Sequence, residues 1–300
     1  MSKFQWTNQQ SSSLKLRTFL LEHGVTRSLL KRVKFHGGEL QVNQKICYPH
    51  EIIHPGDVVT VSLPPEPQNP HLQVSERSIS ILFEDDNYLI LNKPATVATV
   101  PSSLYPNHTL VNRVLGYYMR QGYANRVIHV VNRLDKGTSG PVIFAKNSLA
   151  HSLLDRKLQR HEVQKHYIAL LDGQAVNDHA TIILPIGRRT GSFLERAVVN
   201  DGKFAQTEFW LLDRTMRHSL VKIQLHTGRT HQIRVHFAAL GLPLVGDWLY
   251  NPTNHELPHQ ALHCYRMSFF DALTQRTVTV TAPVPPYFSQ LMQPKNDFPS

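Results

Sequence analysis

A proline-rich polar segment divides the chain into two unequal parts. The stretch PPEPQNPHLQ, from residue 64 to 73, contains four prolines and one large apolar side chain. Proline has no backbone N–H and a fixed φ, so this stretch cannot continue a sheet or pack as a core. A chain of 300 residues also exceeds the usual size of one domain. We predict a small domain at residues 1–63, a linker at 64–78, a large domain at 79–292 and a tail at 293–300.

The charge balance favours a polyanionic partner. Lys and Arg number 32 against 22 Asp and Glu, which leaves a formal net charge of +10. Nucleic acid is the first candidate for such a partner, and a basic protein without one is the alternative. Hydrophobic residues make up 41% of the chain without an unbroken apolar run of about 18 residues, so we expect a globular protein and no membrane span.

The cysteines and the first residues indicate a reducing compartment. Cys47 and Cys264 stand alone, without CxxC spacing, so neither a disulfide framework nor a structural zinc site is predicted. The opening stretch MSKFQWTNQQSSS lacks the apolar region of a signal peptide. We therefore expect a cytoplasmic location.

The first 63 residues alternate helical and strand patterns. Leu16, Phe19 and Leu20 repeat at three- and four-residue steps, which predicts a short helix within residues 14–22. The stretch VTRSLLKRVKF predicts a second helix, which ends at the glycine pair 37–38 before the alternating strand pattern LQVN. A turn and a strand follow in IIHPGDVVTVSL.

This order of helix, basic turn, helix, glycine pair and short strands resembles the S4 RNA-binding module over residues 14–63. Such modules close with an Asn-Gly turn, where this chain has Asn43-Gln44; glutamine is disfavoured at the positive φ of a type I′ turn. The resemblance implies that phosphate approaches the cations of this region, with a solvated helix face as the alternative. These cations are Arg17, Arg27, Lys31, Arg32 and Lys34.

The remainder of the chain predicts a mixed α+β domain with a mainly antiparallel central sheet. ISILFEDDNYLILNKPA reads as two strands joined at residues 84–87, and SLAHSLLDRKLQRH has helical periodicity. Short strands with irregularly spaced helices differ from a regular βαβ winding. Further strand patterns occur in VIHVVNRLD, PVIFAK, HYIALLDG and LVKIQLHTG.

Two stretches bring charged residues to predicted strand ends. Alternation along VIHVVNRLD places Arg133 and Asp135 on the same side, so both could line one cleft; a surface ion pair is the alternative. In LHTGRTHQIRVH, Gly228 allows a sharp turn that puts Arg229 at its tip, before a helix that starts near Thr230. Arg229 thereby becomes available to a carboxylate.

Five motifs in order resemble the RluA family of pseudouridine synthases over about residues 80–290. They are NRLDKGTSG, KHYIALLDG, LHTGRTHQIRVH, GLPLVGDWLY and ALHCYRMSF. The family signature reads His-Arg-Leu-Asp, and Asn132 takes the place of that histidine here. The resemblance implies the pseudouridine synthase fold and the cofactor-free isomerisation of uridine to pseudouridine within RNA.

The resemblance also assigns roles to individual residues. Asp135 matches the family's nucleophile or base, Arg229 the arginine that pairs with it, and Tyr167 the tyrosine that stacks on uracil. Arg133 matches the residue that fills the space of the flipped base. In LNKPATVAT, Lys93 could contact RNA backbone or be a solvated turn lysine.

Large-subunit ribosomal RNA is the substrate that we expect, with transfer RNA as the alternative. A non-catalytic RNA-binding or ribosome-assembly protein and an RNA hydrolase that uses Asp135 are rival classes. Whether Asp135 attacks the sugar carbon C1′, attacks C6 of the ring, or acts as a base stays open. We expect a monomer that uses no cofactor, metal or membrane; His226, His231 and His236 are not spaced to share one ion.

Overall fold

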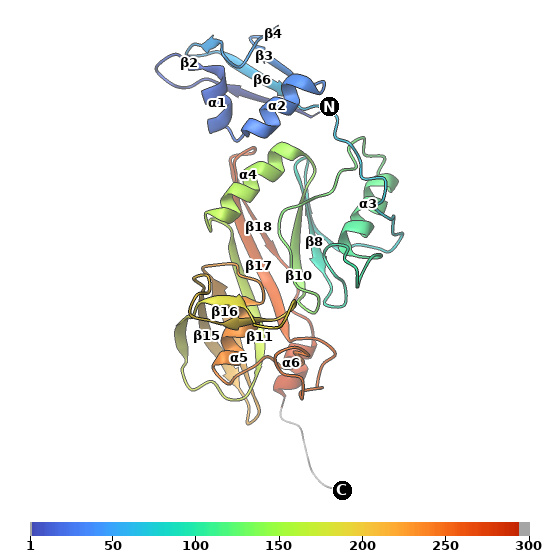
Figure 1. The fold of residues 1–300 in the computed structure, drawn as a ribbon, viewed down its shortest axis with the longest axis vertical. Coiled ribbons are helices and arrows are strands. Elements are labelled where there is room, and N and C mark those ends of the chain that lie inside the picture. The colour runs from blue at the N-terminus through green and yellow to red at the C-terminus, as the bar shows by residue number, and fades with distance from the viewer. Residues whose placement is uncertain (1, 294–300) are drawn as a thin grey trace.

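Two hydrophobic cores organise the chain in the computed structural model, which describes residues 2–293 (Figure 1). The smaller core consists of buried residues from the sequence range 16–63, together with Leu149 of the larger unit. The larger core runs from Tyr88 to Val280. The boundary between the two cores lies near the proline-rich segment. The linker bounds, residues 64 and 78, stay a prediction. Of the predicted tail, residues 294–300 lie outside the described residues.

The smaller unit is a four-stranded antiparallel sheet, in the order β1-β6-β3-β4, with two helices. The second helix begins where the Thr26 hydroxyl accepts a hydrogen bond from the Leu29 backbone N–H at 3.1 Å, which satisfies a free donor of its first turn. Its elements are β1 (Lys3–Thr7), β2 (Leu14–Lys15), α1 (Leu16–Glu22), α2 (Arg27–Phe35), β3 (Glu39–Val42), β4 (Lys45–Ile46), β5 (Ile52–Ile53) and β6 (Val58–Ser62).

A two-residue turn at Asn43 and Gln44 joins β3 to β4. Both residues have positive φ, 50° and 68°, as a type I′ turn requires, although glutamine disfavours this conformation. The Asn43 side chain fixes the turn: it accepts a hydrogen bond from the Val58 N–H at 2.9 Å and donates one to Asp57 at 2.8 Å. Tertiary hydrogen bonds thus impose the tight hairpin on a sequence that lacks the usual glycine.

The larger unit contains two antiparallel sheets, connected by an isolated parallel bridge between Ser139 and His263. A four-stranded sheet, β7-β8-β10-β9, contains the two strands that ISILFEDDNYLILNKPA predicts: β7 (Ile81–Glu84), β8 (Tyr88–Lys93), β9 (His129–Val130) and β10 (Gly140–Ala145). A six-stranded sheet, β12-β15-β16-β11-β17-β18, consists of β11 (Gln164–Asp172), β12 (His179–Ile183), β15 (Gln206–Arg214), β16 (His218–Leu225), β17 (Leu262–Asp271) and β18 (Arg276–Thr281).

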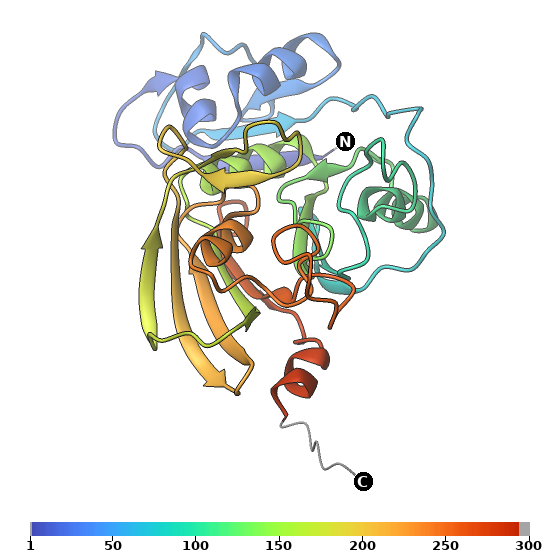
Figure 2. The ribbon, with the colours of Figure 1, turned by 60° about the horizontal axis from the view of Figure 1, so that its bottom comes forward.

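Helices and a short hairpin complete this unit, and the mixed, mainly antiparallel α+β prediction is confirmed. Figures 1 and 2 place α3 on the opposite side of the molecule from the curved six-stranded sheet. No helix within residues 2–293 has the length and apolar character needed to cross a membrane. The remaining elements are α3 (Leu110–Arg120), α4 (Ser148–Gln159), β13 (Ile186–Arg188), β14 (Arg196–Val198), α5 (Gln232–Ala239) and α6 (Tyr287–Met292).

Helix α4 packs against both units (Figure 1). Leu149 is fully buried in the smaller core, whereas Leu154 belongs to the larger one. Gly24 has φ +87° and approaches the Leu153 side chain so closely that a Cβ would lie 2.1 Å from it. The Ser152 hydroxyl donates a hydrogen bond to the Gly24 carbonyl at 2.9 Å. The smaller unit is therefore docked closely on the helix.

Glu66, in the proline-rich segment, joins three further segments at this contact. One of its oxygens lies 2.9 Å from His129 Nε2 and 3.8 Å from Arg32 Nη2, and the other accepts the Ser148 N–H at 3.2 Å. Its side chain is only 6% exposed. Arg32 directs its guanidinium towards this internal carboxylate and keeps a side chain that is 32% exposed, so its contact with RNA stays a prediction.

Replacing Glu66 by glutamine should loosen the contact. Burial alone would raise the pKa of Glu66, but the hydrogen bond and charge of His129, with Arg32, lower it below its usual 4.5. The ionised Glu66 carboxylate thus stabilises the folded state fully above pH about 4.5, and this stabilisation is lost as pH falls through the lower pKa of Glu66 in the folded state. Glu66→Gln should reduce the free energy of unfolding by about 1–3 kcal/mol at pH 7, and the reduction should be smaller at pH 3.

Denaturant unfolding at pH 7 and at pH 3 measures this difference. The matched control is Glu76→Gln in the same linker, because the Glu76 side chain is 83% exposed and pairs only with Arg120 at 3.2 Å. We expect the control to change stability by less than about 0.5 kcal/mol. Equal effects of the two substitutions would contradict a role for Glu66 in docking.

Candidate active site

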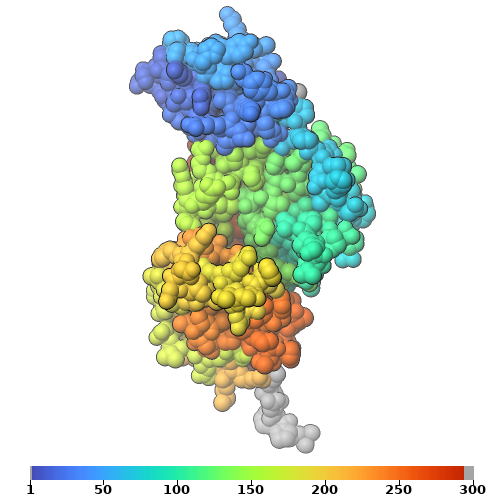
Figure 3. Space-filling model, viewed as in Figure 1, coloured from blue at the N-terminus to red at the C-terminus, as the bar shows by residue number. Residues whose placement is uncertain are grey.

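A cavity of about 670 Å³ opens between the β9–β10 loop, the end of α4, the start of β11 and the β16–α5 turn. Figure 3 shows this hollow where the green segments meet the yellow and orange ones. It brings together the four predicted site residues Arg133, Asp135, Tyr167 and Arg229, which lie far apart in the sequence.

Asp135 lies in an irregular loop rather than in a strand. The strand that VIHVVNRLD predicts is only β9, so the argument from strand alternation is wrong for residues 131–135. The loop is held by its backbone: Leu134 exchanges hydrogen bonds with the Thr99 hydroxyl, at 2.8 and 3.3 Å. Gly137 has φ +96°, and a Cβ there would lie 2.0 Å from Gln260. Although the loop is irregular, Asp135 lines the cavity, next to the exposed Arg133 and the buried Leu134.

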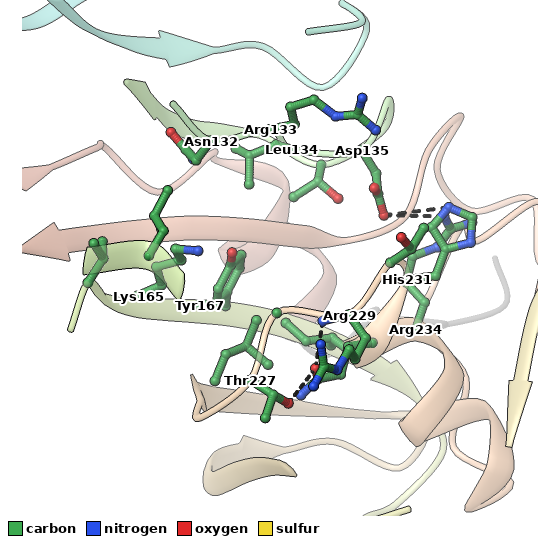
Figure 4. A pocket seen from close by; sticks show the side chains of 18 of the residues that line it. Asn132, Arg133, Leu134, Asp135, Lys165, Tyr167, Thr227, Arg229, His231 and Arg234 are labelled. Carbon is green, nitrogen blue, oxygen red and sulfur yellow. Dashed lines mark hydrogen bonds and ion pairs between the residues drawn. The ribbon is translucent and has the colours of Figure 1, made fainter. Parts of the chain in front are cut away.

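Arg234 is the cation that pairs with Asp135. Its Nη1 lies 3.6 Å from Asp135 Oδ2 (Figure 4). Its Nε and Nη2 each donate to Asp247 at 2.7 Å. Burial alone would lower the pKa of Arg234, but the hydrogen bonds and charge of Asp247, with that of Asp135, raise it. Asp247 is fully buried, so the guanidinium is oriented by one carboxylate and presented to the other.

The predicted pairing of Arg229 with Asp135 is corrected. Arg229 lines the same cavity, but its Nε donates to the Phe204 carbonyl at 2.9 Å. The physical reason is the entry into α5, which begins at Gln232 after His231 adopts a left-handed φ of 58°, rather than near Thr230. The left-handed conformation at His231 brings the first turn of α5 towards the Asp135 carboxylate. Arg229 stays in the β16–α5 connection. The signal that could have indicated Arg234 is the aspartate at 247, because a carboxylate in the core requires a cation as its partner.

Tyr167 forms part of the cavity wall. It lies on β11, pairs with Ile223 on one side and Cys264 on the other, and is 6% exposed. Burial raises the pKa of Tyr167 well above its usual 10, and the charges of Cys264 and Asp135 raise it further. The hydroxyl therefore stays protonated at neutral pH.

His231 approaches the same oxygen of Asp135 as Arg234 does, a contact that the sequence did not predict (Figure 4). Its Nε2 lies 3.8 Å from Asp135 Oδ2, and its Nδ1 is 2.9 Å from the Tyr250 hydroxyl. That hydroxyl accepts the Arg196 N–H at 2.9 Å, which leaves its own proton free to donate to Nδ1; in that arrangement a neutral ring carries its proton on Nε2, towards Asp135. Burial lowers the pKa of His231, which favours this neutral ring.

Two residues near the motif have structural contacts. Asn132, which replaces the family histidine, is buried; its side-chain oxygen accepts the Ile143 N–H at 2.7 Å at the edge of β10. Lys93 is 0% exposed and donates to the carbonyls of Val97 at 2.7 Å and Pro94 at 3.1 Å. The predicted contact of Lys93 with RNA backbone is therefore wrong.

The other predicted RNA-binding cations lie on the smaller unit. Arg17, Arg27, Lys31 and Lys34 are all exposed there, in α1 and α2. Because they belong to a separate unit, their role does not follow from the geometry of the cavity.

The histidines of the β16–α5 region contact different groups. His226 contacts Glu208 at 2.8 Å, His231 contacts Tyr250, and His236 contacts Thr207 at 2.9 Å. A separate cluster, Asp172, His218 and Glu256, has ligand atoms within 4.8 Å of one another. The side-chain amides of Asn251 and Asn254 donate to Asp172 at 2.9 and 3.0 Å. Donors aimed at the carboxylate indicate a structural network.

Comparison with known proteins decides the family. The model of the family described as RNA pseudouridylate synthase matches residues 87–239. The uncharacterized RNA pseudouridine synthase YjbO of Bacillus subtilis is 37% identical over 275 residues, which cover 92% of this chain and 97% of the relative. This chain belongs to the RNA pseudouridylate synthase family. The synthase is thus an isomerase that acts on uridine in RNA, as the RluA-type motifs predict.

Two further similarities agree with this assignment. The ribosomal large subunit pseudouridine synthase D of Pseudomonas aeruginosa is 32% identical over 269 residues, 85% of this chain and 83% of the relative. A solved structure, human RNA pseudouridylate synthase domain containing 1, matches with a TM-score of 0.60 and 25% identity, and the match covers 75% of this chain and 89% of that chain. The pseudouridine synthase fold predicted from the motifs is confirmed.

Lys93 should make stability depend on pH in the alkaline range. Burial lowers the pKa of Lys93 to about 7, although the charge of Asp135 acts to raise it. The unfolded chain then binds this proton more tightly, so stability rises with pH between about 7 and 10.5, by up to about 1.4 kcal/mol per pH unit. We expect the difference in unfolding free energy between wild type and Lys93→Met to increase from pH 7 to pH 9.

Denaturant unfolding at three pH values checks this slope. Lys136→Met, at an exposed position in the neighbouring loop, is the matched control and should show no such trend. A difference between wild type and Lys93→Met that is flat in pH would contradict the lowered pKa.

Proposed function

We propose that this synthase converts specific uridines of large-subunit ribosomal RNA to pseudouridine and that Asp135 is its reactive carboxylate. The observation that carries the proposal is the position of this carboxylate at the cavity, next to Arg234 and His231 and facing the same space as Tyr167. The ribosomal target is supported by the names of relatives such as the enzyme of Pseudomonas aeruginosa.

The reaction needs a carboxylate that stays charged while the base is detached from the sugar. Arg234 at 3.6 Å supplies the opposite charge, and Asp247 prevents the guanidinium from moving to another partner. The carboxylate is then available to take up C1′, to add to C6 or to accept a proton. The Asp135 side chain is 33% exposed, which leaves it accessible to a nucleotide.

Tyr167 acts as a neutral residue in this proposal. Because burial raises its pKa, a phenolate base is unfavourable at neutral pH. The ring can stack on the uracil, and the hydroxyl can donate or accept a hydrogen bond within the cavity. Water that enters here would hydrolyse the glycosidic bond, so a ring that fills the space also protects the product.

The uridine must leave its stack to reach the cavity, at a cost of about a few kcal/mol. Arg133 is exposed on the loop next to Asp135 and can stack in the vacated space while it donates to phosphate. Arg229, on the β16–α5 turn, lines the cavity and contacts the backbone of the flipped nucleotide in this proposal. The exposed cations of the smaller, S4-like unit bind the RNA outside the cavity.

Asp135→Asn removes the charge and keeps the shape. We expect it to abolish pseudouridine formation and to leave RNA affinity within about threefold of wild type, because the carboxylate acts in the reaction. The assay is release of tritium from [5-³H]uridine in unmodified large-subunit ribosomal RNA transcripts, followed by mapping of the modified position. Asp178→Asn is the control, since the Asp178 side chain is 84% exposed in a surface pair with Arg214.

The same assay separates the rival functions. Activity on transfer RNA transcripts alone would replace the ribosomal target. Strand cleavage or abasic sites would indicate a hydrolase, and binding without tritium release would indicate a non-catalytic protein. Retained activity in Asp135→Asn would remove this residue from the proposed role.

Arg27→Gln combined with Lys31→Gln tests the smaller unit. These residues lie one turn apart on α2 and are exposed, so the double substitution should leave the fold intact. If both contact phosphate, binding weakens and the slope of log affinity against log salt falls by about 1.8, or 0.9 per contact. Arg214→Gln with Arg217→Gln, at the β15–β16 turn, is the control. An unchanged slope in the α2 variant would exclude phosphate contact there.

A further inference from the structure

Lys165 places an ammonium group in the active-site cavity. It lies two residues before Tyr167 on β11, and alternate residues of a strand face the same side. The pairing of β11 with β17 shifts at this point because β17 contains one extra residue, Tyr265. The side chains of β11 itself keep their alternation. Both side chains line the cavity, and Figure 4 shows them next to each other.

The Lys165 ammonium has no partner among residues 2–293, where neither a hydrogen bond nor an ion pair engages it. Two other cations, near Asp135, have protein partners: Arg234 is bonded to Asp247, and Lys93 to two backbone carbonyls. Burial lowers the pKa of Lys165, and the neighbouring Cys264 thiol only partly opposes this. A desolvated cation without a counter-charge costs free energy. A ligand that brings a carbonyl oxygen or negative charge would remove this cost.

We propose that Lys165 binds a carbonyl oxygen of the flipped uracil and stabilises the negative charge that the ring acquires during the reaction. This inference rests on the proposed function. When the N1–C1′ bond breaks, its electron pair stays with the uracil and is delocalised onto the carbonyl oxygens, while Lys165 keeps its proton. The Asp135 carboxylate takes up C1′ as an ester on this route; after the ring turns, C5 bonds to C1′ while the bond from Asp135 to C1′ breaks, and the C5 proton leaves to solvent.

The role of Lys165 is independent of where Asp135 attacks. If the carboxylate adds to C6 instead, the charge develops on the O4 oxygen of the same ring, which is again a uracil carbonyl. A fixed cation near that oxygen lowers the barrier in either case, because it is in place before the charge appears.

The position of Lys165 favours the base over the RNA backbone. Lys165 is partly exposed and lies beside Tyr167, which is 6% exposed, so the two side chains form the β11 wall of the cavity. A phosphodiester carries a full charge and is costly to desolvate, whereas uracil is a neutral ring that enters the cavity. Arg133, on the exposed side of the Asp135 loop, is better placed for phosphate.

Lys165→Met, which removes the charge and keeps the length, tests the proposal. The measurements are the single-turnover rate of tritium release from the [5-³H]uridine transcript and the affinity for that transcript. We expect the rate to fall by about 10²–10³ and the affinity to change by less than about threefold. The matched control is Lys222→Met on β16, which removes a charge that lies over the Trp210 ring, 4.9 Å from its centroid, and should retain the wild-type rate.

Lys165→Arg provides a readout that a purely structural role would not change. The wild-type rate should fall as pH rises through the lowered pKa of Lys165, because the ammonium is lost. Arginine stays charged, so Lys165→Arg should restore part of the rate and move this alkaline limb to higher pH.

Three outcomes would overturn the proposal. The first is a Lys165→Met rate within twofold of wild type. The second is a loss confined to affinity, with a salt slope reduced by about 0.9, which would indicate a phosphate contact. The third is an alkaline limb that Lys165→Arg does not move. Absence of tritium release by the wild-type protein would instead refute the proposed function, so the two failures are distinguishable.

Discussion

The active site depends on one guanidinium between two carboxylates. Asp247 is fully buried and holds Arg234 through two hydrogen bonds of 2.7 Å, and Arg234 in turn lies 3.6 Å from Asp135. Asp247 also accepts the backbone N–H groups of Leu249 and Tyr250 at 3.0 and 3.1 Å. The same buried charge therefore shapes the 247–250 loop and orients the cation. Without it, the cation beside Asp135 would lose both hydrogen bonds that orient it.

The two units of the chain are connected through the packing of α4 and the buried Glu66. Leu149 belongs to the core of the smaller unit, while the end of the same helix, at Leu158, lines the cavity. Glu66 joins α2 to the start of α4. A helix shared in this way fixes the distance between the basic surface of α2 and the Asp135 carboxylate. The proposed function uses this geometry, with RNA bound at one place and a uridine modified at another.

Regular elements with strong periodicity were predictable from the sequence. The apolar repeat of Leu16, Phe19 and Leu20 predicted α1, and the strand pair around residues 84–87 appears as β7 and β8. Local patterns failed where distant contacts decide the backbone. Asn43-Gln44 forms its turn because Asn43 is bonded to Asp57 and Val58, and β1 received no prediction because it becomes a strand by pairing with β6.

The sequence by itself determined the chemistry: a basic chain with RluA-type motifs, in which Asp135, Tyr167 and Arg133 belong to one site. Only the tertiary structure decided which cations serve that site. Arg234 rather than Arg229 contacts Asp135, Lys93 donates to backbone carbonyls, and Lys165 lines the cavity without a hydrogen-bond or ion-pair partner in the part of the chain that the structure describes. A charge is assigned to its partner by distance and desolvation, and both depend on how strands and loops far apart in the sequence pack together.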